Sequence, residues 1–155
     1  MSDIDVRIVR LEPQRVAVAY GFGSGPEPIA WEKLITFIKA NGLDKDGQKH
    51  RFFGFNNPNP TPASPNYGYE QWITVGPEVE AEGDIKIKTF GGGMFAVTSC
   101  TLRNITDVWM QLAAWREKSQ YRFGSHQWLE EVLKPPLDEP ITEDMVLDLY
   151  LPIAE

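Results

Sequence analysis

Acidic and aromatic residues stand two positions apart in three short segments of this chain, and such pairs could hold an organic cation. The pairs are Glu70 with Trp72, Trp128 with Glu130, and Asp148 with Tyr150. In an extended strand, residues two positions apart lie on the same face, so each pair places a carboxylate beside an aromatic ring. A carboxylate that loses water among aromatic rings favours its neutral form unless a cation replaces that water, and ring faces attract the same cation. The pattern predicts a site for a flat, lipophilic cation.

Glu130 and Glu131 are consecutive, and the sequence leaves open which of the two carboxylates points inward. In the expected strand 128–133, Glu130 shares a face with Trp128, whereas Glu131 points to the other face. We expect Glu130 to lie inside, beside Trp128, and Glu131 to lie at a rim or in solvent. The alternative is that the two glutamates form an exposed acidic pair on an edge strand.

The last apolar run predicts which face of the sheet is free for this site. Alternate residues of the run share one face, which we expect to pack on helices: Leu147, Leu149, Leu151 and Ile153. Asp148 and Tyr150 then point the other way, and an earlier run repeats this with Glu70 and Trp72. A face that mixes acids with Trp and Tyr fits neither bulk water nor a closed core, so we expect a cavity with aromatic walls and an anionic floor. The candidate ligand-binding residues are Glu130, Trp128, Trp72, Tyr150, Glu70 and Phe52.

The elements that carry these residues occur twice along the chain. The motif W-x-x-L-x-x-F at residues 31–37 returns as W-x-x-L-x-x-W at residues 109–115, a shift of 78 positions (109 − 31). The strand-like runs around these motifs repeat with the same shift to within one residue. Each copy reads strand, strand, helix, strand, Pro-rich loop, strand, and two such copies commonly enclose a ligand cleft between them.

We therefore expect a single α+β domain over residues 1–155, built from a pseudo-twofold repeat of residues 4–76 and 84–155. Its antiparallel sheets should carry two helices on one face and a ligand cleft on the other. Hydrophobic periodicity predicts helices over residues 29–40 and from Asn104 or Thr106 to about Ser119. The helix residues expected to face inward are Trp31, Leu34, Ile35, Ile38, Val108, Trp109, Leu112 and Trp115.

Strands are expected on both sides of these helices. Residues 6–11 and 16–20 should form an edge-like hairpin around residues 12–15, and Gly91-Gly92-Gly93 should form a bulged turn between two further strands. The remaining strands are expected over residues 52–55, 67–75, 85–90, 94–99, 128–133 and 145–153.

Bulk properties exclude several classes of function. The net charge of −7 argues against direct nucleic-acid binding, which needs Lys and Arg to neutralise phosphates. No apolar run is long enough to span a bilayer, and Met1-Ser2-Asp3 does not begin a basic and apolar leader, so we expect a cytoplasmic protein with no membrane contact. Cys100 is the single cysteine and is expected to be a small buried hydrophobe. His50 and His126 have no metal-ligand spacing, so neither a metal nor a cofactor is expected.

With these residues laid out, the chain resembles the GyrI-like small-molecule-binding family. This is an SHS2-type duplicated fold that also forms the effector-binding domains of AraC-type and MerR-type multidrug regulators. The doubled arrangement carries the resemblance, together with three segments: T-F-G-G-G-M-F-A-V at residues 89–97, L-E-E-V-L at residues 129–133, and L-D-L-Y-L-P-I at residues 147–153.

The resemblance implies a ligand and a role for one glutamate. In the family, a glutamate at the base of an aromatic pocket meets cationic ligands, and its position here falls on Glu130. The family tyrosine two residues later is Val132 in this chain. The chain looks like a standalone member without a helix-turn-helix module. The implied function is binding of lipophilic, cationic, aromatic compounds, for sensing or sequestration.

The resemblance also leaves two alternatives open. One is a hydrolase of reactive cyclopropane-bearing compounds, in which Glu130 would activate water; the residues permit an enzyme but do not require one, and no catalytic residue is assigned. The other is a protein inhibitor of the DNA gyrase type. A separate protein partner, either a regulator or a gyrase, is compatible with these functions. The chain is expected to be a monomer or a weak dimer.

Overall fold

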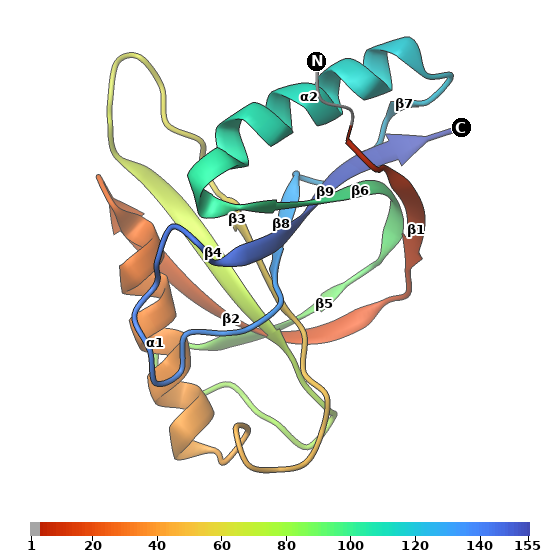
Figure 1. The fold of residues 1–155 in the computed structure, drawn as a ribbon. Helices are drawn as coiled ribbons and strands as arrows, with labels where there is room; N and C mark the ends of the chain where they lie inside the picture. Colours follow the sequence, from red (N-terminus) through yellow and green to blue (C-terminus); the bar gives the residue numbers. More distant parts are fainter. Residues whose placement is uncertain (1–3) are drawn as a thin grey trace. The chain divides into compact units, whose positions relative to one another are not determined.

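The computed structural model describes residues 4–155, which fall into two compact units. One unit is Gln14–Phe90, and the other joins the chain up to Pro13 to Gly91–Glu155. Each unit combines antiparallel strands with one long helix (Figure 1), which confirms the expected α+β class. The expectation that no leader is present rests on the first three residues, which lie outside the described residues.

The unit Gln14–Phe90 contains a four-stranded antiparallel sheet in the order β3-β4-β2-β5. Its elements are β2 (Gln14–Gly23), α1 (Pro26–Ala40), β3 (Phe52–Asn56), β4 (Tyr67–Thr74) and β5 (Lys86–Phe90). Helix α1 packs on β2 and β4 (Figure 1), and it buries Trp31, Leu34 and Ile38 as expected. It begins earlier than predicted because Pro26 lies at its first turn, where a missing N–H breaks no helical hydrogen bond.

The second unit contains the sheet β1-β6-β9-β8, with β7 paired to β9. Its elements are β1 (Arg7–Leu11), β6 (Gly93–Thr101), the 3-10 turn η1 (Leu102–Asn104), α2 (Ile105–Lys118), β7 (Arg122–Phe123), β8 (Leu129–Val132) and β9 (Val146–Ala154). Helix α2 contacts β6 and β9 and buries Val108 and Leu112. Trp109 and Trp115, like Ile35 of α1, are half-buried, so these expected inward residues are only partly enclosed.

The two units repeat one topology, which confirms the duplication. In each unit a long strand, β2 or β6, leads into the helix. β4 or β9 pairs beside that long strand, and a short strand, β3 or β8, completes one side of the sheet. On the other side of each sheet, the outermost strand comes from the other repeat of the sequence. β1 pairs with β6 rather than with β2, and β5 pairs with β2 rather than with β6. The expected hairpin of residues 6–11 with 16–20 is therefore wrong, and the link at Gly91–Gly93 is not a hairpin turn.

The turn residues explain why neither hairpin forms. Only Glu12 and Pro13 separate β1 from β2, and a two-residue hairpin needs a turn with positive φ in its first residue. Pro13 is locked at negative φ, and no non-glycine residue of the described chain has a positive φ. Between β5 and β6, Gly92 has φ +79°, whereas Gly91 is not among the positive-φ glycines, so the pair does not form a primed turn.

Gly92 gives a direct test of this link. A Cβ at Gly92 would meet the backbone carbonyl oxygen of Leu11, and its positive φ disfavours any side chain. We expect Gly92→Ala to lower the free energy of unfolding by about 1–3 kcal/mol, measured by urea denaturation. Gly91→Ala is the matched control, since a Cβ there meets open space, and it should change stability by less than about 0.5 kcal/mol. Equal losses in the two variants would contradict this account.

Candidate functional site

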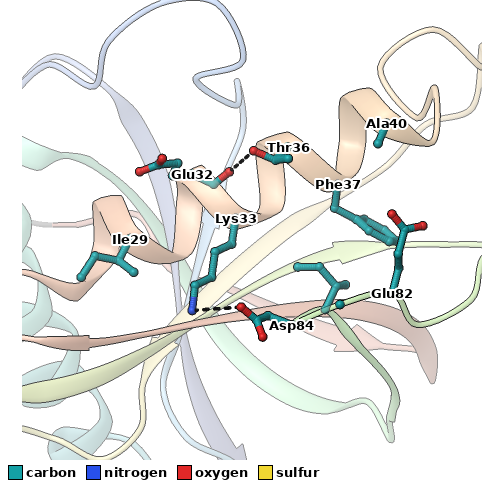
Figure 2. A pocket seen from close by; sticks show the side chains of 10 residues that line it. Ile29, Glu32, Lys33, Thr36, Phe37, Ala40, Glu82 and Asp84 are labelled. Carbon is teal, nitrogen blue, oxygen red and sulfur yellow. Dashed lines mark hydrogen bonds and ion pairs between the residues drawn. The ribbon is translucent and has the colours of Figure 1, made fainter.

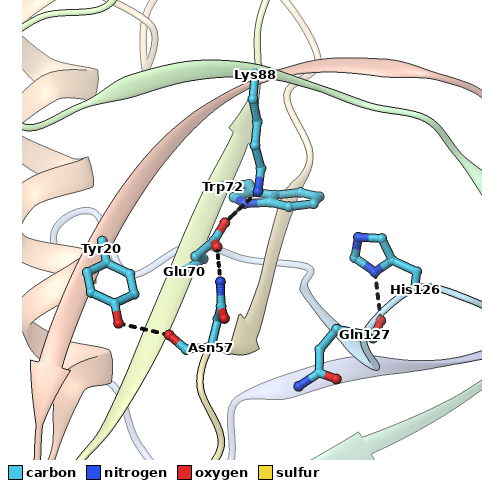
Figure 3. A network of polar contacts seen from close by, with 7 residues as sticks. All are labelled: Tyr20, Asn57, Glu70, Trp72, Lys88, His126 and Gln127. Carbon is cyan, nitrogen blue, oxygen red and sulfur yellow. Dashed lines mark hydrogen bonds and ion pairs between the residues drawn. The ribbon is translucent and has the colours of Figure 1, made fainter.

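A polar cluster in the unit Gln14–Phe90 is centred on Glu70 of β4 (Figure 3). The Lys88 ammonium lies 2.7 Å from Glu70 Oε1 and forms an ion pair with it. The Trp72 indole N–H donates to the same oxygen at 2.9 Å, and the Asn57 side-chain amide donates to Glu70 Oε2 at 2.7 Å. Glu70 itself is 8% exposed. The carboxylate is thus held by three donors at the edge of an aromatic surface.

The pairing of β3 with β4 decides which rings share this face. Phe55 lies opposite Glu70, and Phe53 lies opposite Trp72, so both phenylalanines project to the same side as the carboxylate. The Phe55 and Trp72 rings meet edge to face, with their centroids 5.1 Å apart. The predicted grouping of Glu70 with Trp72, away from the helix, is therefore what the structure contains.

Phe52 lies on the other face. It is opposite Ile73, and its ring centroid is 6.0 Å from that of Trp31 on α1. Because strand side chains alternate, Phe52 belongs to the core beneath the helix, and its predicted place beside Glu70 and Trp72 is wrong. The neighbouring rings of Phe53 and Phe55 lie where Phe52 was expected.

Opposing effects set the ionisation of Glu70. Burial alone would raise the pKa of this carboxyl, because a buried charge loses hydration. Hydrogen bonds from Lys88, Trp72 and Asn57, together with the Lys88 charge, outweigh burial and hold the pKa below its usual value. Glu70 is therefore an anion at neutral pH.

A second acidic cluster lies on β8 and β9 of the other unit. The Tyr150 hydroxyl donates to Glu131 Oε1 at 2.6 Å, and the Phe95 ring meets Tyr150 edge to face at 5.7 Å. Asp148 accepts hydrogen bonds from Arg7 Nη2 and Ser99 Oγ, each at 2.7 Å. Glu131 and Asp148 are each 6% exposed. This unit also presents buried carboxylates beside aromatic rings.

The structure corrects the prediction for Glu130. In the β8–β9 register, Glu131 lies opposite Asp148, whereas Glu130 lies opposite Leu149 of the apolar row. Directly opposed residues share a face, so Glu131 is the glutamate that joins Asp148 and Tyr150. Glu130 is half-exposed on the side of the sheet that carries the apolar row.

Trp128 is also misplaced by the prediction. Trp128 directly precedes β8 and lies on the same side as Glu130, which is the side of α2. Its ring centroid lies 5.0 Å from that of Trp109 on α2 and 6.2 Å from that of Phe123 on β7. Trp128 therefore packs with the helix, and its predicted position beside an inward glutamate is wrong.

A separate hollow of about 410 Å³ lies between α1 and the turn before β5 (Figure 2). Phe37 and Ile85 supply its apolar floor, and Lys33 reaches to 4.0 Å from Asp84 at its rim. Its carboxylates are exposed, with the Asp84 side chain 83% accessible, so water and salt weaken any attraction to a cation. The Glu70 and Glu131 clusters are the better candidates for a binding site.

Metal-ligand groups and membrane-spanning helices are both absent from residues 4–155. Within this range, no three His, Cys, Asp or Glu side chains are grouped so that they could hold a metal ion. Over the same residues, no helix is both long and apolar enough to cross a bilayer.

Duplicated α+β units of this kind, each with one helix packed on an antiparallel sheet, can be compared with known families of small-molecule-binding domains. The model of the GyrI-like small molecule binding domain matches residues 4–154, and the chain belongs to this family. The resemblance seen in the sequence is thereby confirmed. A search of curated proteins finds no match.

Several solved structures share this fold. The EcmrR C-terminal domain has a TM-score of 0.73 at 12% identity, covering 98% of this chain and 98% of that chain. A hydrolase from Listeria innocua has a TM-score of 0.68 at 13% identity, covering 99% and 94%. SAV2435 bound to tetraphenylphosphonium has a TM-score of 0.60 at 11% identity, covering 97% and 94%. The present chain spans 57% of the EcmrR chain in its complex with DNA.

The residues missed by sequence reasoning are Lys88, Arg7, Phe55 and Phe95, while Glu131 was the alternative left open beside Glu130. Arg7 and Lys88 lie on β1 and β5, the two exchanged strands; Arg7 pairs with Asp148 of β9, and Lys88 pairs with Glu70 of β4. The duplication held a usable signal, because a basic residue occurs in the first strand of both repeats. Strand alternation alone could not assign these cations to an acid, since that depends on which strands pair.

Cys100 allows a chemical test of the sheet face that points away from Asp148. The thiol is buried, as expected, and burial, with the charges of Glu130 and Asp148, raises its pKa to about 12. At pH 8 about one thiol in ten thousand is then ionised, so a disulfide reagent should label the folded protein at least about a hundredfold more slowly than the urea-unfolded protein. The labelling rate should rise about tenfold per pH unit. Complete labelling of folded protein within minutes at pH 8 would contradict this assignment.

Proposed function

We propose that this domain binds lipophilic, cationic, aromatic small molecules, for sensing or sequestration, through the acid–aromatic faces of its sheets. The observation that carries the proposal is the buried carboxylate of Glu131, beside the rings of Tyr150 and Phe95. Family membership supports small-molecule binding, and the tetraphenylphosphonium complex of SAV2435 supports the cationic class.

The chemistry of the face favours a lipophilic cation over other ligands. Buried carboxylates repel anions and attract cations strongly, because little water screens them. Aromatic rings add an attraction for a cation that brings its own apolar surface. A neutral aromatic compound would gain only the contact with the rings, so the charge of the ligand should govern affinity.

The two adjacent glutamates offer a matched pair of variants. We expect Glu131→Gln to weaken tetraphenylphosphonium binding by about 1–2 kcal/mol, the scale of a charge-assisted contact, as measured by isothermal titration calorimetry. Glu130→Gln removes the same charge from the other face and should change the dissociation constant by less than about twofold. Neutral triphenylphosphine oxide should bind both variants like the parent protein. A larger loss with Glu130→Gln would restore the assignment made from the sequence.

Tryptophan emission gives an independent measurement of ligand position. Trp72 shares a face with Glu70, whereas Trp128 packs on Trp109 of α2. A bound cationic dye such as rhodamine 6G should quench Trp72 first, since energy transfer and contact quenching fall steeply with distance. Trp72→Phe should therefore remove more of the quenching than Trp128→Phe. The reverse order would place the ligand on the helix side and contradict the proposal.

Hydrolysis is a second candidate, because Glu131 and Tyr150 place a carboxylate and a hydroxyl 2.6 Å apart. Such a carboxylate could orient water while a nearby hydroxyl polarises a bound ligand. One structural neighbour is described as a hydrolase, and at 13% identity it shows the fold. Mass spectrometry of a cyclopropane-bearing alkylating compound, incubated with parent protein and Glu131→Gln, separates the two functions. Intact compound supports binding alone, and addition of water that depends on Glu131 supports hydrolysis.

A further inference from the structure

Lys88 lies where an organic cation would be expected to bind. Its ammonium is 2.7 Å from Glu70 Oε1, 4.6 Å from the centre of the Trp72 ring system and 5.6 Å from the Phe55 ring centroid. Figure 3 shows the side chain descending from β5 beside the Trp72 indole, with its amine directed at Glu70. One carboxylate and two aromatic rings thus surround a positive charge supplied by the protein itself.

We propose that Lys88 is a built-in competitor, whose ammonium fills a cation subsite made by Glu70, Trp72 and Phe55 until a ligand displaces it. This inference rests on the proposed function, and it adds a competing cation to the acid–aromatic face of the unit Gln14–Phe90. The subsite selects for ligands whose positive charge and aromatic surface together outcompete a tethered lysine. Neutral compounds gain nothing by displacing it.

The contacts around Glu70 make this exchange feasible. The Lys88 side chain is 42% exposed, so its ammonium can reach water although Glu70 is mostly buried. Its flexible four-carbon stem lets the ammonium move into solvent while the strand stays in place. Trp72 and Asn57 still donate to Glu70 when the ammonium leaves, so the carboxylate remains oriented for an incoming cation.

Asp148, the acid of the other unit that corresponds to Glu70, has a partner of different chemistry. Asp148 is paired with Arg7 of β1, but the donor is a planar guanidinium and Ser99 holds the second carboxylate oxygen. A guanidinium fork is preorganised for a carboxylate and is not a close mimic of a compact ammonium. The exchangeable cation is therefore a property of Lys88 and of the cluster around Glu70.

The experiment compares tetraphenylphosphonium binding to the parent chain, Lys88→Met, Lys45→Met and the double variant Lys88→Met/Glu70→Gln by calorimetry. Lys88→Met keeps the length of the stem and should lower the dissociation constant about tenfold, since it removes both the competitor and its charge. Lys45→Met makes the same charge change at an exposed position in the loop after α1 and should alter the constant by less than about twofold. The gain should disappear in the double variant, because it requires the Glu70 carboxylate.

The parent chain gives a readout that does not depend on a variant folding. Reductive methylation with ¹³C-formaldehyde retains the lysine charge and labels Lys88, whose methyl signals should be shifted by the Trp72 ring current and are assigned with Lys88→Arg. Adding tetraphenylphosphonium should move these signals to the position of a solvent-exposed lysine. Signals that stay shifted while calorimetry records binding would overturn the inference.

The outcomes separate this inference from the proposed function. Binding to the parent chain with no gain in Lys88→Met overturns the competitor role and leaves the binding function standing. Binding to Lys88→Met alone supports the competitor role and shows that the parent chain is closed to this probe. Binding to neither overturns both.

Discussion

A carboxylate placed among aromatic rings must be matched by donors, and this requirement links the fold of the protein to its site. Each unit meets it with side chains from neighbouring strands. Glu70 is held by Trp72 of its own strand and by Lys88 of β5, while Asp148 is held by Arg7 of β1. Both basic residues arrive on the exchanged strands. The exchange therefore does more than complete each sheet, because it supplies the positive charge that offsets the burial of an acid.

The parts of the structure that the sequence predicts well are those with a strong local period. The duplication is visible because a helical motif and its flanking strands recur in one order, and both copies fold with one topology. The last strand of each repeat alternates apolar residues with acids and aromatic residues. That alternation correctly groups Glu70 with Trp72 and Asp148 with Tyr150, because the side-chain period of a strand is a local property.

The errors arise where the answer depends on pairing between distant segments. Glu130 and Glu131 differ by one position, and a shift of one residue in register moves a side chain to the opposite face. The register with β9, which selects Glu131, is set by contacts that no local pattern contains. Phe52 fails for the same reason, since its pairing with Ile73 places it under α1. Trp128 lies with Glu130 on the side of α2, so alternation grouped the two correctly but could not tell which side of the sheet the helix covers.

The two units have diverged at one structurally equivalent position, and this divergence has a physical cost. Phe55 pairs across the sheet with Glu70 in one unit, and Glu131 pairs with Asp148 in the other. Opposite Glu70, a ring helps to surround a cation. Opposite Asp148, a second carboxylate faces the first, and like charges across an antiparallel pair are destabilising. Donors from Tyr150, Arg7 and Ser99 offset part of that repulsion. Two buried acids that face each other therefore carry a stability cost, which these donors offset only in part.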